Sequence, residues 1–165
     1  MKRRLGLLLL GANLGDRART LRRAVSALDR LDGTRVTRRS RIYETAPIGP
    51  SQRPYLNCAV EIETTRAAMG LLLEAKRLEA QAGRTPGRRW AARPLDVDLI
   101  ALGRERVRTT WLTVPHPAVA RRAFALAPLA DIAPDWRPRG RSTVSALLAA
   151  RKPDPRIVKL WAHGR

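Results

Sequence analysis

The chain has 165 residues, 44% of them hydrophobic, a formal net charge of +19 and a single cysteine. This length and composition exclude a disordered protein and predict one domain over residues 1–165, with a basic helix or tail at 136–165. One cysteine excludes an intrachain disulfide and is typical of a reducing compartment. The longest apolar run near the start, Leu5 to Leu10, is too short for a signal peptide or a membrane span, so we expect a cytoplasmic protein.

The positive charge favours anionic partners, either a nucleotide or a nucleic acid. A general bias of the composition toward arginine is an equally good explanation, because only four of the 33 basic residues are lysines. Charge alone therefore does not decide between ATP and RNA.

The first half of the chain shows a strand, a helix and a second strand. Residues 4–10 form an apolar run typical of a buried strand, and Asp16 is placed to cap a helix that continues toward Gly33. Residues 34–43 predict a polar strand near a sheet edge. A loop rich in proline follows at 44–54.

The second half continues the same alternation. Apolar side chains alternate strictly at 55–63, which predicts a strand with one face in the core and the other outside it. A helix is predicted at 67–82, an arginine-rich loop at 84–93 and a further strand at 95–102.

Two helices are predicted after these strands. His116-Pro117 indicates the start of a helix that ends near Pro128, and residues 142–150 predict a short one. The order βαββαβ followed by helices is typical of the split βαβ, or ferredoxin-like, fold. We therefore expect an α+β protein with a mainly antiparallel sheet and helices packed on it, an architecture that by itself names no function.

Two carboxylates in the last predicted strand are the strongest chemical signal. Asp96 and Asp98 are two positions apart, so both side chains lie on one face of the strand while their neighbours face the core. Proteins usually hold Mg²⁺ with one or two carboxylates completed by substrate phosphates. The alternatives are a solvated strand face, or carboxylates paired with Arg93.

The loop before this strand carries Arg84, Arg88, Arg89 and Arg93, with Trp90 among them. Guanidinium groups match phosphate oxygens in bidentate geometry, and a tryptophan can cover a base or seal a site. A polyphosphate bound together with a metal suits this combination, and a solvated basic loop is the alternative.

Four further residues are candidates for ligand contacts. His116, with Arg122 after it, is placed to donate to a phosphate, and a cap of the predicted helix is the alternative for His116. Tyr55 and Asn57 share the non-core face of their strand, where a ring and an amide suit a flat heterocycle. A routine cross-strand pair is the alternative there.

Several short segments occur together in an order typical of one enzyme family. They are Gly11-Ala-Asn-Leu-Gly-Asp16, Ser40-Arg-Ile-Tyr-Glu-Thr45 with Pro47, Tyr55-Leu-Asn57, Glu79, Gly83-Arg84, Arg89-Trp-Ala-Ala-Arg-Pro-Leu-Asp-Val-Asp98, Val114-Pro-His116, Arg122-Ala-Phe124 and Ile132-Ala-Pro134. Together they resemble 6-hydroxymethyl-7,8-dihydropterin pyrophosphokinase, whose ferredoxin-like fold agrees with the predicted order of elements.

The resemblance implies an ATP-dependent diphosphotransferase of tetrahydrofolate biosynthesis that transfers pyrophosphate from Mg-ATP to the hydroxymethyl group of the pterin and releases AMP. Asp96 and Asp98 would hold two Mg²⁺ ions, and Arg84 and Arg93 would join them in catalysis. ATP would contact Glu79, Arg84, Trp90, Arg93, His116 and Arg122. The pterin would contact Thr45, Pro47, Ile48, Tyr55, Asn57 and Phe124.

The competing hypothesis is an RNA-binding module that uses the face of a basic ferredoxin-like sheet. The chain has one phenylalanine and two tyrosines and lacks the aromatic RNP pattern. Adjacent carboxylates at 96 and 98 would also repel a phosphate backbone. We therefore prefer the enzyme, and expect neither a nucleic acid nor a membrane as its partner.

Overall fold

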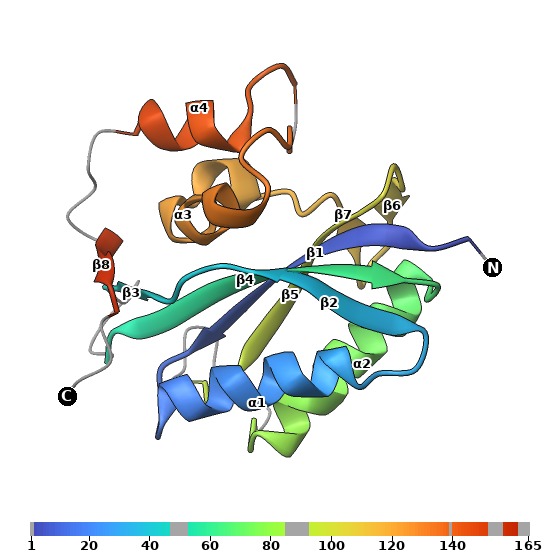
Figure 1. Ribbon diagram of the computed structural model, residues 1–165, viewed down its shortest axis with the longest axis horizontal. Helices are drawn as coiled ribbons and strands as arrows, with labels where there is room; N and C mark the ends of the chain where they lie inside the picture. The colour runs from blue at the N-terminus through green and yellow to red at the C-terminus, as the bar shows by residue number, and fades with distance from the viewer. Residues whose placement is uncertain (1, 47–52, 85–92, 139, 152–156, 162–165) are drawn as a thin grey trace.

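The computed structural model describes residues 2–46, 53–84, 93–138, 140–151 and 157–161. A six-stranded antiparallel sheet runs through the molecule in the order β5-β1-β4-β3-β8, and β2 also pairs with β4 (Figure 1). The strands are β1 (Arg4–Ala12), β2 (Thr34–Arg39), β3 (Tyr43–Thr45), β4 (Tyr55–Thr64), β5 (Asp96–Leu102), β6 (Val107–Arg108), β7 (Thr113–Val114) and β8 (Ile157–Leu160).

The ferredoxin-like topology is confirmed. β2 pairs with one end of β4, where Thr34 lies opposite Thr64, and β3 pairs with the other end, where Thr45 lies opposite Tyr55. β2 and β3 together therefore take the place of the second strand of βαββαβ. The predicted single strand is interrupted at Ser40, whose Oγ accepts a hydrogen bond of 2.8 Å from the backbone N–H of Ala59.

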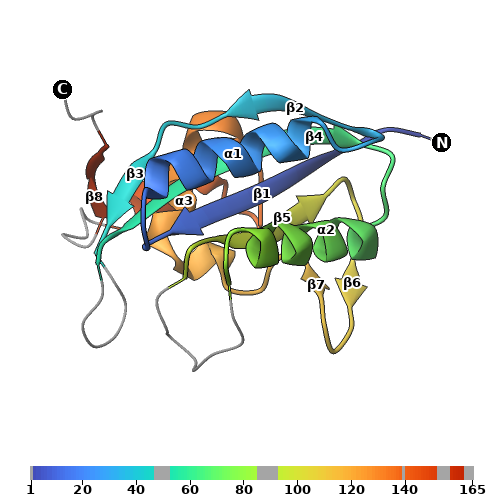
Figure 2. The same ribbon diagram turned by 90° about the horizontal axis from the view of Figure 1, so that it is seen from below.

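Helices cover both faces of the sheet. α1 (Arg17–Asp29) and α2 (Ala68–Gln81) lie on one face, and α3 (Ala123–Ile132) and α4 (Val144–Ala149) lie on the other (Figures 1 and 2). β1 is buried on both sides for this reason, with Leu8 and Leu10 facing α1 and α2 while Leu7 and Leu9 face α3.

The expectation that only one face of β4 belongs to the core was wrong. Leu56, Cys58, Val60 and Ile62 pack under α1 and α2 as predicted, but Ala59 is fully buried in the second core, beneath α3. A small residue at this position lets α3 pack closely on the sheet. The alternation of apolar residues in β4 indicates only the face that packs against the larger core, under α1 and α2. It does not indicate that the other face is also covered, by α3.

The start of α1 agrees with the sequence pattern. The Asp16 carboxylate accepts a hydrogen bond of 3.0 Å from the backbone N–H of Arg19, as expected of a helix cap. At the other end, Gly33 has φ of +71° in the turn into β2. A side chain is unfavourable there both because of this φ and because a Cβ would lie 2.5 Å from Thr65 Oγ1.

The bounds predicted for the third helix were wrong. A short 3-10 turn, Val119–Arg121, follows Pro117, and α3 begins only at Ala123. It then continues through Pro128 to Ile132 instead of ending at the proline. We attribute this to burial, because the apolar residues around Pro128 are almost all enclosed between the sheet and α4 and outweigh one lost backbone hydrogen bond.

Three short strands were not predicted. β6 and β7 form a hairpin with two residues in each strand, too short to show a periodic pattern. β8 pairs with β3, so part of the predicted basic tail adds a strand to the sheet. The short helix of the tail is confirmed as α4, with the hydroxyl of Thr143 capping its first turn.

Candidate active site

Asp96 and Asp98 project from β5 on one face of the sheet, as predicted. Leu95, Val97 and Leu99 point to the opposite face and are buried under α1 and α2. Both carboxylates are partly exposed on the face that carries α3. The twofold period of a strand therefore brings the two acidic groups to the same side.

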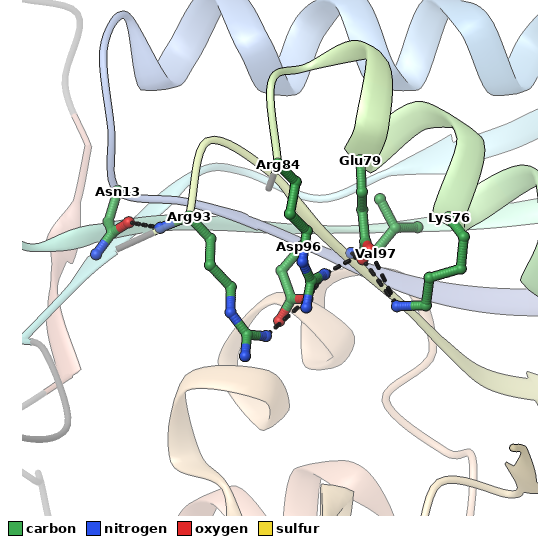
Figure 3. Close-up of polar contacts among 7 residues, drawn as sticks. All are labelled: Asn13, Lys76, Glu79, Arg84, Arg93, Asp96 and Val97. Atoms are coloured by element: carbon green, nitrogen blue, oxygen red, sulfur yellow. Dashed lines mark hydrogen bonds and ion pairs between the residues drawn. The ribbon is translucent and has the colours of Figure 1, made fainter. Parts of the chain in front are cut away.

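Asp96 is paired with two arginines. Its Oδ1 accepts hydrogen bonds from Arg84 Nη1 at 2.8 Å and from Arg93 Nη1 at 3.2 Å (Figure 3). One of the alternatives considered for the sequence, pairing with Arg93, is thus present. The two guanidinium groups have more N–H donors than the carboxylate of Asp96 uses. Arg84 and Arg93 can therefore bond to Asp96 and also donate to an anion bound at the same site.

Glu79 lies behind this pair, on α2, and its side chain is almost completely buried. Its carboxylate accepts a hydrogen bond of 2.9 Å from the backbone N–H of Val97 and one of 3.0 Å from Lys76 Nζ, and it forms an ion pair with Arg84 (Figure 3). A buried carboxylate requires such partners. Glu79 therefore ties α2 to β5 and orients Arg84 toward Asp96.

Arg93 is held by its backbone as well as by its side chain. Its N–H donates to Asn13 Oδ1 at 2.7 Å (Figure 3). Its carbonyl also accepts from the backbone N–H of Asn13 at 3.2 Å. The side chain and backbone of Asn13 thus fix the start of the segment that leads into β5.

Asp98 is the more enclosed of the two carboxylates. Burial, followed by the charge of Asp96, raises the pKa of Asp98 to about 6. A divalent cation would favour the ionised form. No cluster of three acidic, histidine or cysteine side chains occurs among the described residues. The two carboxylates nevertheless fit Mg²⁺, because their oxygens are hard ligands. This ion commonly takes its remaining ligands from water and substrate phosphates.

A hollow of about 320 Å³, here called the first hollow, opens between the sheet and α3. It brings together side chains that the sequence placed in separate segments. Its lining includes Thr45, Tyr55, Asn57, Phe124, Asp96 and Asp98. Arg93 and Arg122 also line it.

The polar groups of the first hollow are held in place before any ligand binds. Asn57 is buried, and its Nδ2 donates to Thr45 Oγ1 at 2.7 Å. Gly11 of the neighbouring strand leaves room for this amide, since a Cβ there would lie 2.9 Å from Asn57 Oδ1. Burial raises the pKa of Tyr55, which therefore presents a neutral phenol. Gly11 was not predicted to be a site residue, although a glycine inside an apolar strand is a signal of close approach.

A second hollow of about 270 Å³ lies between α2 and the β6–β7 hairpin. Asp98 lines both hollows. Lys76, Leu72, Trp111, Thr113 and His116 are among the other residues that line the second one. Of these, only Asp98 and His116 were predicted to be site residues. The others could not be predicted, because nothing in the sequence distinguishes them from helix and turn residues that bind no ligand.

His116 is half-buried beside the second hollow. Burial, and after it the charge of Arg122, lowers the pKa of His116, so the ring is neutral at pH 7. Its Nδ1 accepts a hydrogen bond of 3.2 Å from the backbone N–H of Ala118. This contact closes a turn and is not the helix cap considered for the sequence, because α3 begins only at Ala123, with Arg122 as its N-cap residue and no side-chain cap. The contact leaves the proton on Nε2, which can donate to a ligand.

Some of the remaining predicted site residues lie within the described part of the chain and others lie outside it. Phe124 and Arg122 stand together at the start of α3, with the guanidinium of Arg122 5.7 Å from the ring centroid of Phe124. Pro47, Ile48 and Trp90 lie outside the described residues, as do Arg88 and Arg89.

Comparison with known proteins identifies the family. The family model for 7,8-dihydro-6-hydroxymethylpterin-pyrophosphokinase (HPPK) matches residues 7–134. The chain belongs to this family. The HPPK named 2-amino-4-hydroxy-6-hydroxymethyldihydropteridine pyrophosphokinase in Bacillus subtilis is 44% identical over 124 residues, which cover 74% of this chain and 74% of that protein. Its namesake in Methylorubrum extorquens is 42% identical over 139 residues, 84% of this chain and 88% of that one.

Two larger proteins also contain an HPPK-like region. The mitochondrial folate synthesis bifunctional protein of Pisum sativum is 39% identical over 127 residues, and the match spans 76% of this chain but 24% of the pea protein. The crystal structure of wild-type Plasmodium falciparum HPPK-DHPS with pteroate superposes with a TM-score of 0.69 at 14% identity, over 90% of this chain and 42% of that one. This superposition supports the fold alone.

The comparisons confirm the predicted family and class of reaction, a pyrophosphokinase of folate synthesis. They give no support to the RNA-binding alternative. Within the described ranges, every helix falls short of the length and apolarity that crossing a membrane requires.

Proposed function

We propose that the protein transfers the pyrophosphoryl group of ATP to the hydroxymethyl oxygen of 6-hydroxymethyl-7,8-dihydropterin. The hydroxymethyl oxygen forms a bond to the β-phosphorus and its proton is released to solvent, while the bond from that phosphorus to the α–β bridging oxygen breaks and AMP leaves. One observation carries the proposal: two hollows, one suited to a flat heterocycle and one bordered by Lys76 and His116, meet at the carboxylate of Asp98.

The first hollow is proposed to bind the pterin. Tyr55 and Phe124 supply aromatic faces for a flat ring, and Asn57 and Thr45 supply hydrogen-bonding groups for its edge. These two polar side chains are fixed on adjacent strands, so the edge of the pterin would meet donors and acceptors that need little reorganisation. Pro47 and Ile48 remain expected contributors from outside the described residues.

ATP is proposed to occupy the second hollow with its phosphates directed toward Asp98 and the first hollow. Arg84, Arg93 and Arg122 reach this junction as phosphate ligands, and His116 can donate through Nε2. Glu79 acts on ATP indirectly, because its contacts are to Arg84 and the backbone of β5. Trp90 remains expected at the nucleotide, on residues that the structure does not describe.

Asp96 and Asp98 are proposed to hold the metal, with two Mg²⁺ ions expected. When bound, the metal neutralises phosphate charge and favours the departure of AMP. The side chains of the protein orient the two substrates and stabilise the charge that develops on the phosphates, so catalysis rests on positioning and electrostatics without a covalent enzyme intermediate.

We also propose that residues 1–165 act as one domain, in the cytoplasm. Support for one domain comes from β8, which returns near the end of the chain to pair with β3 at the first hollow. Support for the compartment comes from the single cysteine, Cys58, which is buried in the core.

The decisive experiment is product analysis by phosphorus NMR with ATP, Mg²⁺ and 6-hydroxymethyl-7,8-dihydropterin. The expected products are AMP and a pterin diphosphate, formed only when the pterin is present. ADP would retain the ATP site but overturn the transfer chemistry. Absence of turnover by folded protein, with tight and salt-sensitive RNA binding, would overturn the enzyme assignment.

A further inference from the structure

Trp111 is the most exposed large hydrophobic side chain among the described residues, with a relative exposure of 80%. It stands in the turn between β6 and β7. Tryptophan is usually mostly buried, because its large apolar surface gains free energy on leaving water. A single exposed apolar side chain needs no explanation by itself, but this indole borders the second hollow and is placed to contact a ligand there.

The backbone around Trp111 is held in place rather than loose. Thr109 Oγ1 accepts hydrogen bonds from the N–H groups of Trp111 at 3.3 Å and Leu112 at 3.0 Å, and the N–H of Thr109 donates to the carbonyl of Leu112 at 2.9 Å. Leu112 and Val114 are buried and anchor the following strand in the core. The fold thus presents the indole outward from a fixed turn.

The surroundings of Trp111 favour a particular ligand. Trp111 lines the second hollow, together with apolar residues such as Leu72 and with the charged Lys76 and Asp98. Asp98 also lines the first hollow, so the reacting phosphates must lie near it. The nucleoside of the same ATP molecule must then extend away from the first hollow, into the space that Trp111 borders.

We propose that Trp111 stacks on the adenine of bound ATP and is a nucleotide-specificity residue of this chain. This inference rests on the proposed function and adds to it the residue that covers the base. Aromatic rings stack favourably on bases, and the contact would remove the apolar face of the indole from water. Phosphate binding would remain the task of the arginines at the junction.

The test uses the full-length protein and two variants, Trp111→Ala and Trp111→Phe. Affinity for the slowly hydrolysed analogue α,β-methylene-ATP is measured by calorimetry with Mg²⁺, beside inorganic tripolyphosphate, which lacks a base. We expect Trp111→Ala to weaken binding of the ATP analogue about tenfold, the size of one base–aromatic contact, and Trp111→Phe to restore most of it. Affinities for tripolyphosphate and for the pterin should not change.

Leu73→Ala is the matched control, since Leu73 is also exposed, at 64%, but does not line the second hollow. This variant should bind the ATP analogue like the wild type. An unchanged affinity in Trp111→Ala, or an equal loss for the analogue and for tripolyphosphate, would overturn the stacking role. An exposed tryptophan would then be assigned to a protein partner.

Failure of the proposed function has a different signature. The wild-type protein would then bind neither the ATP analogue nor the pterin, or would form ADP instead of AMP. A wild type that forms AMP and pterin diphosphate, combined with normal nucleotide affinity in Trp111→Ala, would contradict only the role of Trp111. Quenching of tryptophan fluorescence by the nucleotide should be smaller in Trp111→Phe than in wild type, where any quenching that remains comes from the other tryptophans, and this difference gives an independent readout.

Discussion

The two hollows that meet at Asp98 are built in different ways. The recognition groups of the first lie on paired strands, where Asn57 and Thr45 are both buried and bonded to each other. The outer wall of the second is a hairpin with two-residue strands, and its tip is exposed. Regular paired strands position hydrogen-bonding groups closely enough to read the edge of a heterocycle, whereas long charged side chains can adapt to phosphates.

The polar groups that line the first hollow are of two kinds. Asn57 and Thr45 are neutral and bond to each other across neighbouring strands, whereas Arg93, Arg122, Asp96 and Asp98 are charged. At the junction, Arg84 and Arg93 share the carboxylate of Asp96, and Glu79 also pairs with Arg84. Binding of ATP would redistribute these ion pairs, while the pterin would meet groups that are already in place.

The largest effect is expected for Asp98→Asn, because Asp98 belongs to both hollows. The substitution keeps the shape of the side chain but removes a carboxylate that we propose as a metal ligand, so we expect kcat to fall by about 10²- to 10³-fold or more. Steady-state kinetics measures the loss, and circular dichroism checks the fold. Asp131→Asn is the control, since it makes the same chemical change at a residue that lines neither hollow. Wild-type turnover in Asp98→Asn would remove the metal assignment.

Glu79→Gln should affect ATP more than the pterin, because Glu79 lines neither hollow but pairs with Arg84 and with Lys76, which lines the second one. The amide can still accept from the N–H of Val97 but loses its charge, which pairs with Arg84 and Lys76. We expect a loss of about 1–3 kcal/mol in the free energy of unfolding, measured in urea, and a higher KM for ATP. Pterin affinity should stay within twofold. A variant with reduced pterin affinity and an unchanged KM for ATP would reverse the assignment of Glu79 to the ATP side.

Gly11→Ala should disturb the first hollow alone. Its Cβ would lie 2.9 Å from Asn57 Oδ1, which forces the amide out of place. Because the loss is that of about one buried hydrogen bond, we expect pterin affinity to fall about tenfold with ATP affinity unchanged. Gly70→Ala in α2 is the matched control, since no atom lies within 4 Å of the Cβ it would add. Normal pterin binding in Gly11→Ala would show that Asn57 does not read the heterocycle.

The smallest effect is expected at the far end of α3, the helix that brings Phe124 to the first hollow. Arg41 and Tyr43 both bond to the carboxylate of Asp131. Burial raises the pKa of Asp131, but these hydrogen bonds outweigh it and hold the pKa below its usual value. A carboxylate with a depressed pKa stabilises the fold above its unfolded pKa of about 3.9, and this contribution is lost as the pH falls through the lower, folded value.

Asp131→Asn should therefore reduce the free energy of unfolding at pH 7 by less than about 1 kcal/mol, because the ion pair is exposed to solvent. The difference between the variant and the wild type should disappear as the pH falls below about 4. Urea unfolding at several pH values measures both quantities. A difference that persists unchanged down to pH 2 would mean that the charge of Asp131 does not stabilise α3.

The sequence by itself determined the βαββαβ order of the main elements along the chain, the cap at Asp16 and the common face of Asp96 and Asp98. Each follows from residues that are near neighbours in the chain, where helical and strand periods decide which side chains share a face. The resemblance to one family also named the residues that the structure gathers in the first hollow, such as Tyr55 and Phe124.

Only the tertiary structure decided how these groups are supported. The buried second face of β4, the contact between Gly11 and Asn57, and the bond from Arg93 to Asn13, 80 residues away, leave no periodic signal in the chain. The same holds for β6, β7 and β8, since their strands are too short for a pattern. Such contacts depend on how separate layers pack, and packing is a property of the folded molecule rather than of neighbours in the sequence.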